Sequence, residues 1–220
     1  MMRIALIPMA ELSQAKTRLA GVLDGDSRTE LALAMLTDVL AACHESGCFD
    51  RIVVVTNDEA VLAHARESGA DALAEPDGLS GGLNGSLDFG RRRLARNGAN
   101  ELVILPADVP LARPGDVRAV VDELAATPRQ RVVLVRSRDN GTNALALRPP
   151  KAIGMHFGRN SADAHRAAAE AAGIAVAEVV NERLAYDIDS TDDLAELPRL
   201  PVGAATRGWI DAHARYAAER

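Results

Sequence analysis

A carboxylate placed between two prolines is the strongest candidate for chemistry in this sequence. Asp108 ends the apolar stretch ELVILPAD at residues 101–108, with Pro106 before it and Pro110 after it. Because proline restricts the backbone, we expect Asp108 to be held in one position. A fixed carboxylate suits Mg²⁺, which binds one or two carboxylates together with substrate phosphates. Helix capping is the alternative, but Pro110 and Pro114 delay the next helix and argue against it.

Two further carboxylates, Asp187 and Asp189, lie in the sequence YDIDS at residues 186–190. We expect a short strand here, whose two-residue period would place both side chains on one side. Neighbouring carboxylates repel each other, so they need a cation or a basic partner. With Asp108 they could form a magnesium site of three carboxylates. Alternatively, Asp189 and Ser190 only cap the following helix, or one carboxylate caps while the other binds metal.

Two cations, Lys16 and Arg18, follow the first apolar stretch by about ten residues, in the sequence PMAELSQAKTRLA. Two such charges beside the end of a sheet suit a polyphosphate, because charge-assisted contacts are short and strong. The glycines of a P-loop are missing, and no G-x-G-x-x-G sequence follows any expected strand, so a dinucleotide cofactor is not expected. The same residues also fit ordinary solvated charges at a helix end.

A glycine-rich stretch, PDGLSGGLNGSL at residues 76–87, carries almost no charge. Glycine lets a backbone approach a flat ligand closely. Asn84 and Ser86 could add side-chain hydrogen bonds to a purine edge. A flexible surface loop is the alternative.

The sequence DNGTN at residues 139–143 separates two apolar runs. Asn-Gly between such runs is typical of a tight hairpin turn. A plain hairpin does not need Thr142 and Asn143 directly after that turn, so these two side chains are candidates for binding.

The sequence HFGRNSADAH at residues 156–165 has Gly158 in a turn, Ser161 at a helix start and His165 one turn later on the same face. Amides and a hydroxyl at a helix N-terminus form an anion site. A plain N-cap and a structural histidine are the alternative interpretation.

The elements that must position these residues alternate along the chain. We expect strands at residues 3–8, 51–56, 101–108, 131–135 and 144–147, with shorter ones at 70–75, 174–180 and 184–189. Capping boxes that begin at Ser27 and Thr56 predict two helices, Pro114 starts another, and further helices are expected at 84–96, 160–172 and after Ser190.

This alternation predicts an α/β fold: a mostly parallel sheet with helices on both faces. We expect one domain over residues 1–220, with a helical tail at about 198–220 that has Trp209 as its large apolar anchor. In such sheets ligands bind beyond the carboxyl ends of the strands. The polar residues that follow strands 3–8, 51–56, 101–106 and 132–136 should therefore share one crevice.

Composition narrows the class of protein. The chain has 220 residues, 48% of them hydrophobic, and a net charge of -6, with no basic block of the kind that binds nucleic acid. No run approaches the length of a membrane span, and the N-terminus reads directly as a strand. The two cysteines fit no metal signature. We expect a cytoplasmic protein with no nucleic-acid or membrane partner.

Five segments together resemble the 2-phospho-L-lactate guanylyltransferase and phosphoenolpyruvate guanylyltransferase family. These enzymes belong to the larger group of nucleotidyltransferases that resemble molybdenum-cofactor guanylyltransferase. The segments are AKTRLA, LPADVPL, DNGTNALALRPP, FGRNSADAH and DIDSTDDL, in the order and spacing seen in that family, and the resemblance runs from about residue 3 to 197. It implies the GT-A-like fold of nucleotide-diphospho-sugar transferases. It also implies transfer of GMP from GTP to a small phosphorylated three-carbon acid, with Mg²⁺ as cofactor, in coenzyme F-420 biosynthesis.

The resemblance implies a role for each candidate residue. The acceptor would be 2-phospho-L-lactate, phosphoenolpyruvate or 3-phosphoglycerate. Its phosphate and carboxylate would be held by Thr142, Asn143, Gly158 and Ser161. Magnesium would be held by Asp108, Asp187 and Asp189. The triphosphate would be met by Lys16 and Arg18, which with Asp108 would be the catalytic residues. The nucleotide would also contact Leu83, Asn84 and Pro106, with guanine facing the glycine-rich stretch.

One position departs from the family pattern. Members often carry a lysine shortly after the proline of the first strand, where this chain has Ala10 and Glu11 in IPMAEL. A different transferase on the same fold, for sugar 1-phosphates or glycosyl groups, is one alternative. A degenerate nucleotide-binding protein without catalysis is another: the Ala10 and Glu11 departure favours it, and the three aspartates argue against it. We also expect a homodimer.

Overall fold

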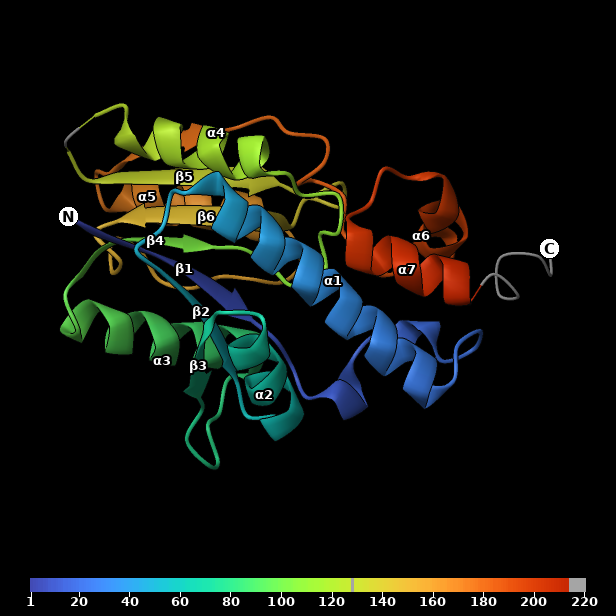
Figure 1. Ribbon diagram of the computed structural model, residues 1–220. Helices are drawn as coiled ribbons and strands as arrows, with labels where there is room; N and C mark the ends of the chain where they lie inside the picture. The colour runs from blue at the N-terminus through green and yellow to red at the C-terminus, as the bar shows by residue number, and fades with distance from the viewer. Residues whose placement is uncertain (128, 214–220) are drawn as a thin grey trace.

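The computed structural model describes residues 1–127 and 129–213. Its centre is a sheet with the strand order β3-β2-β1-β4-β6-β5-β7 (Figure 1). The strands are β1 (Met2–Pro8), β2 (Arg51–Thr56), β3 (Asp71–Ala74), β4 (Ala99–Ile104), β5 (Arg131–Arg136), β6 (Thr142–Arg148) and β7 (Ala175–Glu178). Four neighbouring pairs are parallel, and β6 runs antiparallel to both β4 and β5. The expected mostly parallel sheet is confirmed.

Helices cover both faces of this sheet (Figure 1). They are α1 (Gly25–Ser46), α2 (Glu59–Glu67), α3 (Gly82–Arg96), α4 (Pro114–Ala125), α5 (Ser161–Ala171), α6 (Thr191–Glu196) and α7 (Ala204–Ala212), with short 3-10 turns at Leu12–Gln14, Thr17–Leu19 and Leu197–Arg199. The central strands are buried on both sides, as parallel strands require. Ala5 and Ile7 of β1 face α1, α2 and α4 in one core, whereas Ile4 and Leu6 face α3 and α5 in the other.

The hairpin between β5 and β6 is confirmed, but its loop is longer than the Asn-Gly pair predicts. The strands end at Arg136 and begin again at Thr142, and the N–H of Ser137 donates to the carbonyl of Gly141. Asn140 adopts the left-handed conformation, with φ of 70°. The loop thus delivers Thr142 and Asn143 at the carboxyl edge of β5.

Several expected boundaries are wrong. Helix α1 begins earlier than the Ser27 box predicts, because the Asp24 side chain accepts the N–H of Ser27. Asp58 caps α2, since Thr56 is the last residue of β2.

Two further expectations about secondary structure also fail. Helix α3 begins at Gly82, so half of the glycine-rich stretch is helical. No strand forms at 184–189, where a turn leads into irregular chain. The carboxylates at 187 and 189 are therefore positioned by tertiary contacts and not by backbone hydrogen bonds to a neighbouring strand.

The C-terminal part covers a third core, beside the two faces of the sheet. Trp209 and Ile210 of α7 pack with Met35 of α1 and with Ile188, so Trp209 closes the chain's own core. Asp38 of α1 accepts the N–H groups of Ala205 and Thr206 at the start of α7. Helices α6 and α7 lie together at one end of the molecule (Figure 1). A homodimer stays a prediction, and residues 214–220 of the expected tail lie outside the described residues.

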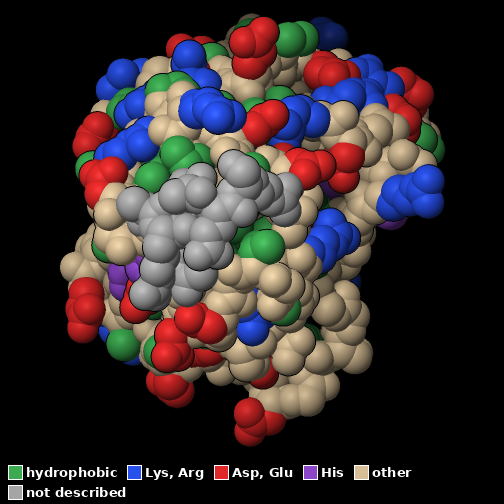
Figure 2. All heavy atoms as spheres, turned by 90° about the vertical axis from the view of Figure 1, so that its right-hand side faces the viewer, with side chains coloured by type: hydrophobic (Ala, Val, Ile, Leu, Met, Phe, Trp, Pro, Cys, Tyr) green, Lys and Arg blue, Asp and Glu red, His purple; other side chains and the backbone are tan. Residues whose placement is uncertain are grey.

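No helix among the described residues is long and apolar enough to cross a membrane. On the face in Figure 2, acidic and basic side chains are interspersed over much of the described surface.

Candidate active site

Two adjoining hollows lie at the carboxyl edge of the sheet, as the topology predicts. The first hollow, of about 230 Å³, is lined by Pro8 and the segment that follows it, by Lys16, and by Leu83, Pro106 and Asp108, among others. The second hollow, of about 280 Å³, shares Pro8 and Leu83 with the first and extends toward Asn57. Residues after β1, β2 and β4 thus meet here. The residues that directly follow β5 line neither hollow.

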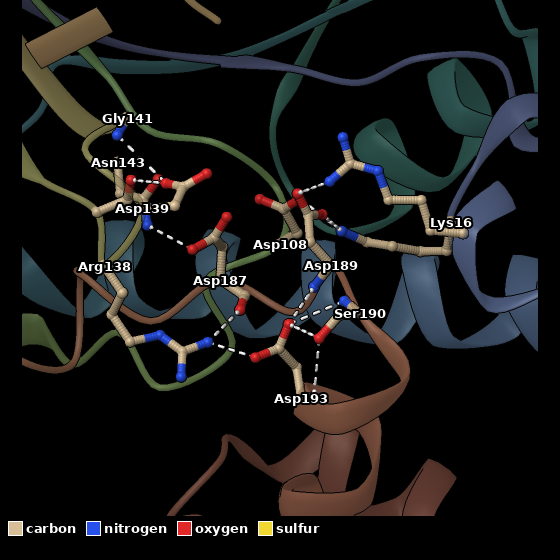
Figure 3. A network of polar contacts seen from close by, with 12 residues as sticks. Lys16, Asp108, Arg138, Asp139, Gly141, Asn143, Asp187, Asp189, Ser190 and Asp193 are labelled. Carbon is tan, nitrogen blue, oxygen red and sulfur yellow. Dashed lines mark hydrogen bonds and ion pairs between the residues drawn. The ribbon is translucent and has the colours of Figure 1, made fainter. Parts of the chain in front are cut away.

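One residue that lines the first hollow is a lysine held between two carboxylates (Figure 3). The Lys16 ammonium lies 2.6 Å from Asp108 and 2.9 Å from Asp189, and the lysine side chain is only 10% exposed. Burial alone would lower the pKa of Lys16, but the two carboxylates outweigh it and raise the pKa above its usual range. Arg18 reaches Asp189 at 3.4 Å from a far more exposed position. The structure therefore brings Lys16, Arg18, Asp108 and Asp189 together.

Asp187 carries the most perturbed carboxyl group of the site. Burial, with the nearby charge of Asp108 and a smaller effect of Asp189, raises its pKa to about 6, although the Asn143 amide that donates to it at 3.2 Å opposes the shift. A carboxyl that resists ionisation beside two other carboxylates marks a place that favours added positive charge.

The segment of residues 187–189 is held by contacts that the sequence did not reveal. The N–H of Ile188 donates to the Asp108 carbonyl at 3.1 Å. Arg138 stacks on the Tyr186 ring at 3.5 Å from its centre and pairs with Asp193. These contacts replace the expected strand.

A second group of candidate residues forms a buried chain of polar contacts behind the first hollow. The Thr142 hydroxyl lies 3.0 Å from Ser161 and 3.1 Å from Nδ1 of His165. The other ring nitrogen of His165 accepts the backbone N–H of His156 at 3.0 Å. Because that amide can only donate, the single proton of the neutral ring must lie on Nδ1 and point at Thr142.

This arrangement leaves one hydroxyl hydrogen available. The Thr142 hydroxyl accepts a hydrogen bond from His165. The hydrogen bond between Thr142 and Ser161 uses only one of their two hydroxyl hydrogens. The remaining hydrogen has no acceptor within the part of the chain that the structure describes. The N–H groups of Ser161 and Ala162 are already bonded to Gly158 and Asn140 carbonyls. The hydroxyls, and not those two amides, are therefore the groups that could donate to an anion.

The sequence alone favours a structural role for His165. The environment of its ring depends on residues from other segments, which the sequence of one helix does not show. Its ring is fully buried, and Phe157, which lines the first hollow, lies edge-on against it at 4.9 Å. Burial, helped by the charge of His156, lowers the pKa of His165 to about 4, so the ring is neutral at ordinary pH. Gly158 has a φ of 128°, which residues with a side chain rarely adopt.

The hydrogen bonds of Asn84 correct the expectation that its side chain is free to bind a purine edge. Both atoms of its amide are occupied by the backbone of Phe157, at 2.9 Å and 2.7 Å. Asn84 therefore ties α3 to the segment that carries Gly158. Leu83 is exposed and lines both hollows, and its contact with a nucleotide stays a prediction.

The departure at Ala10 and Glu11 also falls at these hollows. Ala10 lines both of them, and Glu11 lines the second. The Glu11 carboxylate accepts from the Asn57 side chain at 2.6 Å. No cation from these two positions replaces the missing lysine, so Lys16 and Arg18 are the basic groups that the site offers near Asp108.

The donor set suits Mg²⁺, but in the described residues the place is taken by a lysine. No group of three or more His, Cys, Asp or Glu side chains is arranged there as a ready metal site. Hard carboxylate oxygens are the ligands that Mg²⁺ prefers, and an ammonium already lies between two of them. The three-carboxylate magnesium site stays a prediction.

Comparison with known proteins gives close relatives over nearly the whole chain. A phosphoenolpyruvate guanylyltransferase from Sphaerobacter thermophilus is 42% identical over 208 residues, covering 94% of this chain and 98% of that protein. A 2-phospho-L-lactate guanylyltransferase from Methanothermobacter thermautotrophicus is 33% identical and covers 94% of this chain and 88% of its own length. A 3-phospho-D-glycerate guanylyltransferase from Phenylobacterium zucineum is 34% identical, covering 93% and 94%.

Solved structures confirm the expected fold at low identity. A protein from Desulfovibrio desulfuricans G20, described as a nucleotide-diphospho-sugar transferase, superposes with a TM-score of 0.79 at 15% identity and covers 99% of this chain and 97% of its own. A CMP:2-keto-3-deoxy-manno-octonic acid synthetase complexed with CTP superposes with a TM-score of 0.62 at 15% identity, covering 90% and 98%. The family model described as "Guanylyl transferase CofC like" matches residues 2–210, and the chain therefore belongs to that family.

Proposed function

We propose that this protein transfers GMP from GTP to the phosphate of a small phosphorylated three-carbon acid and releases pyrophosphate. The observation that carries the proposal is the Lys16 ammonium held between Asp108 and Asp189 at the edge of two joined hollows. Relatives named as guanylyltransferases of phosphoenolpyruvate, 2-phospho-L-lactate and 3-phospho-D-glycerate support this reaction class.

The chemistry needs two anions to be brought together. An oxygen of the acceptor phosphate attacks the α-phosphorus of GTP, the bond from that phosphorus to the bridging oxygen of the β-phosphate breaks, and pyrophosphate leaves with the electron pair. The attacking phosphate is already an anion near neutral pH, so no strong general base is required. Positioning and neutralisation of charge then supply the rate enhancement.

Each group of residues has a task in this scheme. Lys16 and Arg18 bind the triphosphate, and Lys16 turns from its carboxylate partners toward the phosphates. Asp108, Asp187 and Asp189 would hold Mg²⁺, which when bound supplies positive charge to the oxygens of the transferred phosphoryl group.

The acceptor acid would be held by the second group of residues. The free hydroxyl hydrogen of Thr142 and Ser161 is a donor suited to its phosphate or carboxylate, next to Gly158 and Asn143. The product would enter coenzyme F-420 assembly, as the sequence resemblance implies.

The test is pyrophosphate release from GTP and magnesium, with phosphoenolpyruvate, 2-phospho-L-lactate and 3-phosphoglycerate offered in separate reactions. Release with one of these acids, but not with a sugar 1-phosphate, supports the proposal and identifies the acceptor. Release with the sugar phosphate alone would favour the rival transferase. GTP binding without release in any reaction would favour the non-catalytic alternative.

A further inference from the structure

The second hollow contains a carboxylate that no described residue uses. Glu75 follows the edge strand β3 and lines this hollow. Its backbone N–H donates to the carbonyl of Thr56 at 2.9 Å, which fixes the residue beside the end of β2. Its side chain is only partly exposed and has no hydrogen bond or ion pair with any part of the chain that the structure describes. A half-buried carboxylate without a partner is a hydrogen-bond acceptor in need of a donor.

A serine with a buried hydroxyl lines the same hollow. Ser86 of α3 is 6% exposed and lines the hollow, and its Oγ has no hydrogen-bond partner among the described residues. Buried polar atoms are nearly always paired in folded proteins, so each exception calls for an explanation. Glu75 and Ser86 come from different elements, and their unused polar atoms are independent observations on one hollow.

Of the other polar side chains that line the hollow, Gln14 is exposed, and Asn57 and Glu11 contact each other. Asn57 donates to Glu11 at 2.6 Å, and the Ser13 hydroxyl donates to Glu11 as well. Asn84, at the neighbouring position of α3, is bound to Phe157 through both amide atoms. Glu75 and Ser86 are therefore the two polar side chains of this hollow that are at least partly buried and have no partner among the described residues.

We infer that the second hollow binds the base of the nucleotide, and that Glu75 selects guanine by accepting two hydrogen bonds from its edge. Guanine presents N1–H and the 2-amino group side by side, and both donate, so one carboxylate can accept from both. Adenine has a lone pair at N1, which a carboxylate repels. Ser86 lies beside this contact and supplies a hydroxyl to a remaining polar atom of the base.

The inference rests on the proposed function and assigns its base specificity. The two hollows share the wall formed by Pro8, Ala10, Gln14 and Leu83. One nucleotide can thus extend from the second hollow, with its base, to the first, with its phosphates beside Lys16. Rejection of ATP would arise from a carboxylate left without its donors, which is a costly mismatch.

The experiment measures equilibrium binding of GTP, ITP and ATP by calorimetry with Mg²⁺ and without acceptor acid. Inosine keeps N1–H but lacks the 2-amino group, so ITP tests one of the two hydrogen bonds. The unaltered protein should bind GTP most tightly, ITP more weakly and ATP most weakly. Glu75→Gln should weaken GTP binding by about tenfold or more, because a charge-assisted contact is lost. The same variant should narrow the difference between GTP and ATP.

Two further variants make the result specific. Ser86→Ala should weaken GTP binding by a smaller factor, since one neutral hydrogen bond is removed. Glu67→Gln changes an exposed glutamate at the end of α2, away from both hollows, and should leave all three affinities unchanged. Thermal unfolding of each variant shows that the fold is retained.

The outcomes separate this inference from the proposed function. If the unaltered protein binds GTP but Glu75→Gln binds GTP and ATP as the unaltered protein does, the base assignment is wrong and the transfer reaction stands. If the unaltered protein binds none of the three nucleotides, the proposed function fails. Preferential loss of GTP over ATP in Glu75→Gln supports the inference.

Discussion

Replacing Lys16 by methionine removes the ammonium that neutralises the carboxylates of the site. Lys16 contacts Asp108 at 2.6 Å and Asp189 at 2.9 Å, with side chains 28% and 44% exposed, respectively. Removing one partner of a buried ion pair costs about 3–5 kcal/mol, whereas an exposed pair contributes about 0–1 kcal/mol. The partial exposure of both carboxylates places Lys16→Met between these limits, at a loss of about 2 kcal/mol in the free energy of unfolding.

Urea unfolding measures this loss, with Arg51→Met as the matched control. Arg51 pairs with Asp71 at 2.7 Å, but both side chains are exposed, and we expect a loss below about 1 kcal/mol. Magnesium adds a second readout, because the freed carboxylates should bind it without competition from the lysine. Mg²⁺ should therefore raise the unfolding midpoint of Lys16→Met more than that of the unaltered protein. If Lys16→Met costs no more than Arg51→Met and gains nothing from Mg²⁺, the assigned charge balance is wrong.

Three further perturbations test separate parts of the site. Asp108→Asn should lower pyrophosphate release by about a hundredfold or more with the fold intact, and Asp122→Asn, on the exposed side of α4, should leave it unchanged; near-normal release from Asp108→Asn would remove the proposed metal role. The pKa of His165, lowered to about 4, lies below its ordinary value of 6.5, so the unfolded chain takes up a proton first. The free energy of unfolding should therefore fall by up to about 3 kcal/mol as pH drops from about 6.5 to 4. Urea midpoints measured across this pH range should show the fall in the unaltered protein but not in His165→Asn. If the same fall persists in His165→Asn, the buried neutral ring is refuted. An alanine Cβ at Gly85 would lie 2.0 Å from the Ser80 carbonyl oxygen, so Gly85→Ala should destabilise the protein by about 1–3 kcal/mol and weaken nucleotide binding. Gly115→Ala is the control, because no atom lies within 4 Å of the added Cβ, and it should not destabilise the protein. Equal urea midpoints for the two variants would contradict the close approach at Gly85.

The architecture was open to prediction because local pattern and buried strands determine it. Apolar runs such as residues 51–56 and 101–104 are typical of strands in a sheet that is buried on both faces. Ligands bind beyond the carboxyl ends of such strands, which locates the crevice. Lys16 and Asp108 could be assigned to one site on that basis, although Lys16 lies 92 positions before Asp108.

The features that sequence reasoning missed depend on contacts between distant segments. The Asn84 side chain could form hydrogen bonds with a nucleotide base. The backbone of Phe157, 73 residues later, already occupies both polar atoms of its amide. The segment at 187–189 has alternating carboxylates typical of a strand edge, yet Arg138 and Asp108 hold it as irregular chain.

Helix starts were misplaced for a more local reason. The Ser27 and Thr56 boxes match the capping pattern, but Asp24 and Asp58 supply the side chains that accept the first free N–H groups. His165 and Glu75 have no sequence signature, because their roles depend on tertiary contacts. A ring nitrogen of His165 accepts the backbone N–H of His156, and the Glu75 carboxylate lines the second hollow without a described partner.

The most direct test follows the α-phosphate of GTP into product. GTP labelled at the α-phosphorus is incubated with magnesium and phosphoenolpyruvate, and the products are separated before and after phosphatase treatment. Transfer of GMP should give a labelled compound joined to the acid through a diphosphate, which phosphatase leaves intact because neither phosphate is terminal. Label found only in GTP, or in GMP from hydrolysis, for phosphoenolpyruvate and for the other two acids would contradict the proposed transfer.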